Sequence, residues 1–307
     1  MFYHRDMRIL NFGSLNIDYV YAVDHFVRPG ETLASARRDV FSGGKGLNQS
    51  VALARAGADV YHAGGIGKAD GLFLKKMLSD SGVHTEFIEE YETPTGHAII
   101  QVDASGQNCI LLFGGANRIQ TPEFIDEVLS HFEKGDYLVL QNEINNVGYI
   151  MEKAHEKEMV IFLNPSPYNR DIDALPLSYV DCFLLNEVEA ADICRVQRPD
   201  DSGELLAVLG KKFPGAKIVL TLGKNGVVYK DGHCIYRHGI YKVTVVDTTA
   251  AGDTFTGYFI SCMARGMSPE DILKYASVAS SIAVSRKGAA PSIPLFDEVK
   301  NAKLAAV

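Results

Sequence analysis

The chain has 307 residues, of which 47% are hydrophobic and 22% are charged, enough for one large domain with a sizeable core. Its net charge of −8 argues against binding of a nucleic-acid backbone, which needs a basic surface. The five cysteines show no C-x-x-C spacing, which favours a reducing, cytoplasmic setting over a disulfide framework or zinc site. No apolar run reaches the ~18 residues of a membrane span, and the start MFYHRDMRIL lacks the apolar core of a signal peptide.

Short apolar runs that end in turn residues predict strands buried on both faces of a parallel sheet. They are MRILNFG (7–13), DYLVLQN (136–142), MVIFLN (159–164), VDCFLLN (180–186) and KIVLTLG (217–223). Helix-like segments between them occupy residues 46–58, 71–82, 121–132 and 145–158. This alternation predicts an α/β layered fold with a mostly parallel central sheet flanked by helices.

Two regions interrupt the alternation. Residues 16–44 carry two strand-like runs around the turn RPGE, and residues 95–115 form a predicted hairpin with a turn at DASGQN. Four strands without intervening helices do not fit a strand–helix–strand series. They predict a small separate sheet that covers one end of the main domain, with edge strands of the main sheet as the alternative.

Several polar residues directly follow the predicted strands. Each alone fits a turn or a helix cap. Ligands of open α/β sheets bind beyond the carboxyl ends of the strands, so several polar residues at one edge predict a site. The candidates are Asn16, Asp18, Asn142, Glu143, Asn164, Asn186 and Glu189.

The glycine-rich segment SGGKGLNQS (42–50) opens a predicted helix but is not a P-loop, because Gly46 follows Lys45. The segment GGIGKADG (64–71) is not the dinucleotide fingerprint either. Glycines at 43, 44 and 46 permit close backbone approach, and Lys45, Asn48 and Gln49 add both donors and acceptors. That mixture suits a polyol ligand, whereas the alternative is a tight strand-to-helix turn.

The segment VVDTTAAGDTFTGYF (245–259) places small residues before an apolar helix. N–H groups at a helix N-terminus have no intrahelical partner and form an anion site. Asp253, at the edge of that site, suits a base that takes a proton from a substrate hydroxyl during phosphoryl transfer. The alternative is an aspartate that stabilises the helix dipole, worth about 0.3–1 kcal/mol.

The segments SGGKGLNQSVALARAGADV and VVDTTAAGDTFTGYF resemble the two signature regions of the PfkB carbohydrate kinases. Further matches run in the order of the ribokinase branch of that family and cover the chain from about residue 9 to residue 294. They are NFGSLNIDYV, PGET, TPTGHAIIQVDASGQN, GGAN, NPSP, LNEVEA, TLGKNG and SRKGAAPSIP.

The resemblance implies a ribokinase-like α/β fold, with one domain over residues 1–307. A small β-sheet lid would come from the discontinuous segments 16–42 and 95–114, and would also form a homodimer contact. The implied reaction is ATP-dependent phosphorylation of the O5 hydroxyl of D-ribose. Alternatives are another acceptor within the family (fructose, a deoxyribose or a nucleoside) or, less favoured, a non-catalytic sugar or nucleotide sensor.

The resemblance also implies roles for individual residues. Asp253 would be the catalytic base, and Ala250, Ala251 and Gly252 the anion hole. The sugar would contact Asp253 and six further residues: Asn16, Asp18, Gly44, Lys45, Asn48 and Glu143. The nucleotide would contact Asn186, Thr221, Gly223, Gly226, Ala251 and Gly252.

Two ions are implied. Glu189 would bind Mg²⁺ through a water molecule, because magnesium keeps much of its hydration. K⁺ would be held beside the anion hole by Asp247 and Thr249 together with Gly288 and Ser292 of SRKGAAPS (285–292). The chain departs from the family pattern at Phe113 and Gly114, near the sugar side of the lid, which bears on the identity of the sugar. The implied adenine pocket lies near the helix-like YASVASSIAVS segment.

Overall fold

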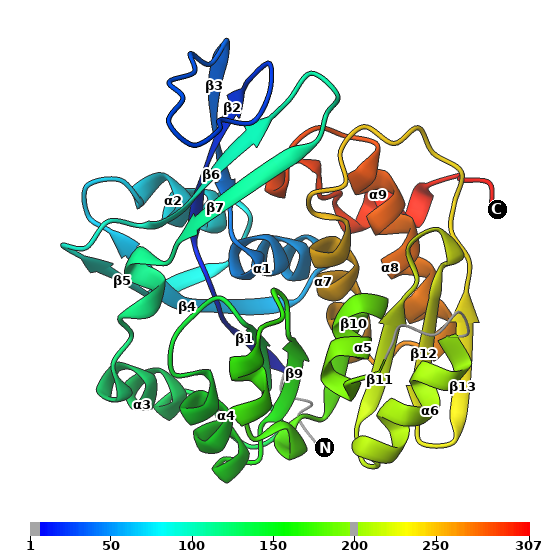
Figure 1. Cartoon of the computed structure of the whole chain (residues 1–307). Coiled ribbons are helices and arrows are strands. Elements are labelled where there is room, and N and C mark those ends of the chain that lie inside the picture. The colour runs from blue at the N-terminus through cyan, green and yellow to red at the C-terminus, as the bar shows by residue number, and fades with distance from the viewer. Residues whose placement is uncertain (1–6, 197–201) are drawn as a thin grey trace.

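A computed structural model describes residues 7–196 and 202–307 (Figure 1). The first six residues, on which part of the cytoplasmic expectation rests, lie outside the described residues. Within the described ranges, nine strands form the main sheet in the order β13-β12-β11-β10-β9-β8-β1-β4-β5. All neighbouring pairs are parallel from β11 to β5, whereas β11–β12 and β12–β13 are antiparallel.

The five predicted apolar runs all form strands of this sheet. They are β1 (Arg8–Phe12), β8 (Tyr137–Gln141), β9 (Val160–Asn164), β10 (Cys182–Asn186) and β11 (Lys217–Thr221). Four further strands complete it: β4 (Asp59–Gly67), β5 (His84–Tyr91), β12 (Val227–Asp231) and β13 (Cys234–His238). The mostly parallel sheet confirms the predicted fold class.

Helices cover both faces of the main sheet and bury two apolar cores. One core includes residues of α1 (Lys45–Arg55), α2 (Leu72–Asp80), α7 (Ala251–Ala264), α8 (Pro269–Val284) and α9 (Phe296–Asn301). The other includes residues of α3 (Pro122–Ser130), α4 (Val147–Glu156), α5 (Glu187–Cys194) and α6 (Ser202–Lys212). Successive residues of β1 enter opposite cores, Ile9 the first and Leu10 the second, as the alternation of a strand requires.

Short 3₁₀ helices lie in the connections. They are η1 (Gly115–Arg118), η2 (Arg170–Ala174), η3 (Leu177–Tyr179), η4 (Gly223–Asn225) and η5 (Ala290–Ser292).

The two helix-poor regions form a separate four-stranded sheet in the order β3-β2-β6-β7, and not edge strands of the main sheet. Its strands are β2 (Asn16–Ala22), β3 (Arg37–Gly43), β6 (Gly96–Val102) and β7 (Asn108–Phe113). β2 and β6 pair in parallel, and the outer pairs are antiparallel. Figure 1 shows this small sheet projecting beyond the edge of the main sheet, above α1.

Candidate functional site

The site is centred on the N-terminus of α7, which begins at Ala251 after Thr248, Thr249 and Ala250. The Ala251 N–H donates to the Thr248 carbonyl at 3.2 Å. Helix geometry leaves the N–H groups of Gly252 and Asp253 without an intrahelical acceptor. A Cβ placed on Gly252 would meet no atom within 4 Å, so open space lies beside these amides. An anionic group can therefore approach the start of this helix.

Asp253 is only 6% exposed, and both of its carboxylate oxygens accept amide protons from α1. Asn48 Nδ2 donates to Oδ2 at 3.0 Å, and Gln49 Nε2 donates to Oδ1 at 3.0 Å. These two amide donors fix the orientation of the Asp253 carboxylate. The start of α1 and the start of α7, about 200 residues apart in sequence, thus build one polar centre.

Most of the residues predicted to bind the sugar lie in β2 or at the start of α1. The Asp18 side chain packs against Gly43. A Cβ on Gly43 would lie 2.2 Å from Asp18 Oδ2, so this contact requires a glycine at position 43. Burial, and then the negative charge of Glu143, raise the pKa of Asp18 to about 7. Asn16 is oriented by Asn117, whose Nδ2 donates to its Oδ1 at 2.8 Å.

Lys45 and Glu143 lie between that group and Asp253. Glu143 Oε2 accepts a proton from the Lys45 backbone N–H at 2.9 Å and another from the Ser14 hydroxyl. Burial lowers the pKa of the Lys45 ammonium, but the carboxylates of Asp253, Glu143 and Glu189 outweigh that effect, and the net pKa is raised. Lys45 therefore stays charged among three carboxylates.

Two cavities meet at the start of α7. The smaller, of about 100 Å³, is lined by residues that include Lys45, Asn186, Glu189 and Asp253. The larger, of about 610 Å³, also borders the helix start, at Ala251 and Gly252. Both are lined by Thr221, Gly252 and Phe255, so Gly252 stands where they join.

The larger cavity holds most of the predicted nucleotide residues. Its lining contains Thr221, Gly223, Gly226, Ala251 and Gly252, whereas Asn186 lines the smaller cavity. One wall is the face of α8 formed by Ser277, Ser280, Ser281 and Val284, within the YASVASSIAVS segment. Another wall comes from residues 239–243, which no sequence pattern had indicated.

Asn186 and Glu189 form a capping box at the start of α5. Asn186 Oδ1 accepts the Glu189 N–H at 2.9 Å, and Glu189 Oε2 accepts the Asn186 N–H at 3.0 Å. Among residues 7–196 and 202–307, no group of three or more His, Cys, Asp or Glu side chains could hold a metal ion. Magnesium bound with substrate phosphates needs only one or two carboxylates, so the buried Glu189 in the lining of the smaller cavity fits such an ion.

The segments predicted to flank a monovalent cation lie against each other. Asp247 Oδ1 accepts the Thr249 N–H at 2.9 Å, and Oδ2 accepts the Gly288 N–H at 3.0 Å. Burial raises the pKa of Asp247, but these hydrogen bonds outweigh it and the net pKa is lowered. The Ser292 hydroxyl is buried and donates to the Ala289 carbonyl at 2.7 Å. Carboxylate, hydroxyl and carbonyl oxygens are suitable ligands for a hard cation.

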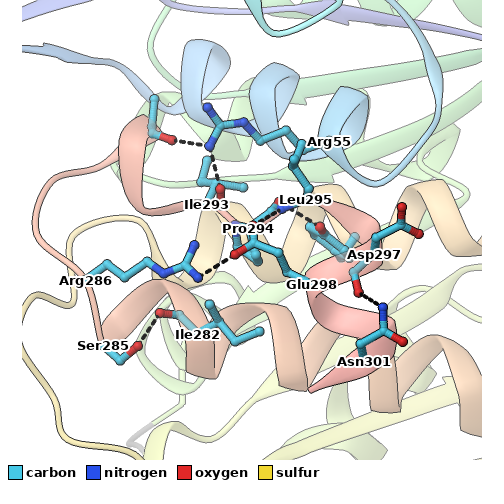
Figure 2. Close-up of polar contacts among 12 residues, drawn as sticks. Arg55, Ile282, Ser285, Arg286, Ile293, Pro294, Leu295, Asp297, Glu298 and Asn301 are labelled. Atoms are coloured by element: carbon cyan, nitrogen blue, oxygen red, sulfur yellow. Dashed lines mark hydrogen bonds and ion pairs between the residues drawn. The ribbon is translucent and has the colours of Figure 1, made fainter. Parts of the chain in front are cut away.

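The second of these segments is fixed from the far end of α1. Figure 2 shows Arg55 reaching the chain at residue 293: its Nη1 donates to the Ile293 carbonyl, and to the Ala290 carbonyl at 3.0 Å. In the same view, Arg286 forms a 2.7 Å ion pair with Glu298 of α9. One helix therefore carries polar groups for Asp253 at its start and holds the 290–293 segment at its end.

Sequence reasoning missed the polar side chains that support the site from within the core. Three of them are buried: Asn117 donates to Asn16, Gln141 donates to Gln49, and Asn11 accepts from Gln141. The available signal was a polar residue inside an otherwise apolar strand, as at Asn11 in β1 and Gln141 in β8. Such a residue needs a buried partner, which here belongs to the site.

Comparison with known proteins agrees with this geometry. The description "pfkB family carbohydrate kinase" matches residues 7–295. A ribokinase of Staphylococcus aureus is 35% identical over 309 residues, which cover 95% of this chain and 98% of the relative. The chain belongs to the PfkB family of carbohydrate kinases and is a sugar phosphotransferase.

Solved structures extend the likeness to the fold. A ribokinase of Cryptococcus neoformans in complex with ADP superimposes with a TM-score of 0.84 at 32% identity, covering 96% of this chain and 99% of that one. A ribokinase of Arabidopsis thaliana complexed with ribose and ATP gives a TM-score of 0.85 at 26% identity, covering 96% and 98%. The ribokinase-like α/β fold with its small second sheet is thus confirmed. In the described part of the chain, no helix is long and apolar enough to cross a membrane.

Proposed function

We propose that this protein transfers the γ-phosphoryl group of ATP to the O5 hydroxyl of D-ribose, giving D-ribose 5-phosphate and ADP. The observation that carries the proposal is the junction at Gly252, where the two cavities meet beside the Asp253 carboxylate. One cavity has the lining for a nucleotide, and the polar groups of α1 and β2 suit a polyol. The similarity of this chain to ribokinases, one of them solved with ribose and ATP, supports ribose as the acceptor.

In this proposal Asp253 is the catalytic base. Its carboxylate accepts the O5 proton, the O5–P bond forms, and the bond from the γ-phosphorus to the β,γ-bridging oxygen breaks, leaving the electron pair on ADP. The N–H groups of Gly252 and Asp253, with the preceding Ala250–Ala251 turn, stabilise negative charge on the phosphoryl oxygens. The Lys45 ammonium adds positive charge on the same side.

The sugar hydroxyls would be held by a ring of donors and acceptors. Asp18 and Glu143 offer carboxylates, Asn16 and Asn48 offer amides, and Gly44 leaves the backbone open. Asn48 supports this assignment in particular, because its Oδ1 is buried with no hydrogen-bond partner among the described residues. A hydroxyl of the substrate would satisfy that acceptor.

The nucleotide would occupy the larger cavity, with its adenine against α8 and its phosphates directed at Gly252. Thr221, Gly223 and Gly226 line this route, and Asn186 lies beside Glu189 on the phosphate side. Magnesium bound with ATP neutralises charge on the phosphates, and Glu189 would hold its hydration shell. K⁺ would bind between the Asp247–Thr249 and Gly288–Ser292 segments, behind the helix start.

The small sheet would act as a lid over the sugar side of one domain and as the contact of a homodimer. Exposed apolar side chains on one face of β7 support the dimer, with Leu111 68% and Phe113 49% exposed. We place the protein in the cytoplasm, which suits five free cysteines and a need for ATP.

The direct test is to incubate the purified protein with D-ribose, ATP and Mg²⁺ and to examine the product by ³¹P and ¹³C NMR. We expect a single monophosphate coupled to C5 and an equimolar amount of ADP. A product phosphorylated at O1, or no sugar phosphate at all, would overturn the assignment.

A further inference from the structure

The Asp253 carboxylate lies at the end of a chain of buried amide side chains that runs away from both cavities. Gln49 Nε2 donates to Asp253 Oδ1 at 3.0 Å, and Gln49 Oε1 accepts a proton from Gln141 Nε2 at 2.7 Å. Gln141 Nε2 also donates to Asn11 Oδ1 at 3.0 Å. Asn11, Gln49 and Gln141 are at most 1% exposed, so water cannot replace these partners.

The chain continues from Asn11 to a buried histidine. Asn11 Nδ2 donates to the Gly46 carbonyl at 2.8 Å and to Ser50 Oγ at 2.8 Å. Ser50 Oγ lies 2.8 Å from His62 Nδ1. Both amide protons of Asn11 are thereby used, and its oxygen accepts from Gln141.

These hydrogen bonds set the orientation of every amide in the chain. Asp253 Oδ1 accepts a proton from Gln49 Nε2, so Gln49 directs its nitrogen at Asp253 and its oxygen at Gln141. Gln141 must then direct its nitrogen at Gln49, and the same nitrogen serves Asn11. Gln141 donates both of its protons, and rotating its amide by half a turn would bring its oxygen against two other oxygens.

The far end of the chain agrees with this direction. Burial lowers the pKa of His62 to about 3, with only a partial offset from a backbone group of Gly13, so the ring is neutral. Ser50 accepts from Asn11 and can donate its own proton to His62 Nδ1. The proton of the ring then lies on Nε2, a buried atom without a hydrogen-bond partner among the described residues, and every bond from Asp253 to His62 joins a donor to an acceptor.

We propose that Gln141 is a positioning residue for Asp253: by donating both amide protons it keeps the Gln49 nitrogen directed at the carboxylate. Gln141 lines neither cavity and has no contact with a substrate in the proposed function, on which this inference rests. Without Gln141 the Gln49 oxygen loses its donor, and the amide is then directed only through its nitrogen, by Asp253 Oδ1 at 3.0 Å and Asn164 Oδ1 at 3.4 Å. The carboxylate then turns more freely away from the hydroxyl it must deprotonate.

A double-mutant cycle between Gln141 and Gln49 separates this role from ordinary structural support. Methionine has nearly the shape of glutamine but no amide, so Gln49→Met removes the donor to Asp253 and Gln141→Met removes the group that orients it. We expect Gln49→Met to lower kcat about tenfold or more, and Gln141→Met about fivefold, with the sugar KM changed less than about threefold. In the Gln49→Met background the further Gln141→Met change should have little effect on kcat.

Gln120 provides a matched control. It is also 1% exposed, donates from Nε2 to a carbonyl (Ala116, 2.8 Å) and, like Gln141, has a buried Oε1 with no partner among the described residues. Gln120→Met should cost comparable thermal stability yet leave kcat within about twofold, alone or combined with Gln49→Met. If Gln141→Met does not fold, Gln141→Asn, which keeps the amide but shortens the side chain, takes its place in the cycle.

The pH–rate profile gives a second readout that a purely structural role would not move. A carboxylate that loses an N–H donor holds its proton more tightly, so the acidic limb of kcat/KM should shift to higher pH in Gln49→Met and, less, in Gln141→Met.

Equal kcat losses from Gln141→Met in both backgrounds, or losses no larger than those of Gln120→Met, would overturn the inference. All assays use the acceptor that the unmodified protein phosphorylates fastest, so a preference for another sugar would overturn the proposed acceptor and leave this test intact.

Discussion

Asn48 and Asp253 lie 205 positions apart in sequence and are joined by a 3.0 Å hydrogen bond from Nδ2 to Oδ2. The bond uses the donor side of the Asn48 amide and leaves its acceptor oxygen for a ligand. The neighbouring Gln49 adds the second donor to the same carboxylate. The first turns of α1 therefore determine where the Asp253 carboxylate lies, although Asp253 itself belongs to α7.

Replacing Asp253 by asparagine tests its role as base. Asp253→Asn keeps the shape of the side chain but removes its ability to take a proton, so kcat should fall by about 10²–10⁴-fold. The KM values for sugar and ATP should change less than about threefold, measured by a coupled assay of ADP formation. Asp297→Asn, at an exposed carboxylate of α9, is the control and should keep full activity. Unchanged turnover in Asp253→Asn would rule out the base assignment.

Asp18 makes the stability of the ligand-free protein depend on pH. Its pKa of about 7 lies above the ordinary value of 3.8, so its contribution to the free energy of unfolding is fully present below pH 3.8 and is lost as pH rises to about 7. Asp18→Asn stays neutral throughout. Its Tm relative to the unmodified protein should therefore be higher at pH 8 than at pH 5, by about 3 °C or more.

The same substitution should raise the sugar KM at pH 8, because the carboxylate that would accept sugar hydroxyls is gone. Differential scanning fluorimetry across pH and steady-state kinetics measure the two effects. A Tm difference that stays constant from pH 5 to pH 8 would show that Asp18 does not titrate in this range.

Arg55 should control the response to K⁺ without touching either cavity. Arg55→Met removes the hydrogen bonds to the Ala290 and Ile293 carbonyls and loosens the segment that ends at Ser292. We expect the K⁺ concentration for half-maximal activation to rise about fivefold or more, while kcat at saturating K⁺ changes little. The reason is that K⁺ then binds only when the 285–292 segment is ordered, and this ordering lowers the apparent affinity for K⁺.

Arg265→Met is the matched control, because Arg265 donates to the Ala56 carbonyl at 3.2 Å and not to the cation segment. Assays in choline buffer with added potassium give the activation curves. A protein that does not respond to potassium at all would exclude the cation site, and equal shifts in the two arginine variants would exclude the special role of Arg55.

The small sheet should carry the dimer contact. Leu111→Asp places a charge in the exposed apolar face of β7 and should shift the protein from dimer to monomer in analytical ultracentrifugation. Leu72→Asp, at a leucine of α2 that is 53% exposed, is the control and should leave the association state unchanged. A monomeric unmodified protein would contradict the proposal outright.

The sequence predicted which strand ends border the site, but not the buried amide side chains that support it. Asn164 and Asn186 end strands of a parallel sheet, so their meeting at one edge followed from the fold class. The orientation of Gln49 did not follow, because it depends on Asn11 and Gln141 from two other strands, and tertiary contacts alone bring those amides together. The wall of the larger cavity at residues 239–243 has no helical or strand periodicity and could be found only in the structure.

The central claim is an ATP-dependent kinase whose acceptor is D-ribose, and an acceptor panel tests it most directly. Steady-state kcat/KM is measured with ATP, Mg²⁺ and K⁺ for D-ribose, 2-deoxy-D-ribose, D-fructose and a set of nucleosides. We expect the value for D-ribose to exceed each of the others by about tenfold or more, a margin of about 1.4 kcal/mol in transition-state binding. A higher kcat/KM for any other acceptor would contradict the claim and reassign the protein within its family.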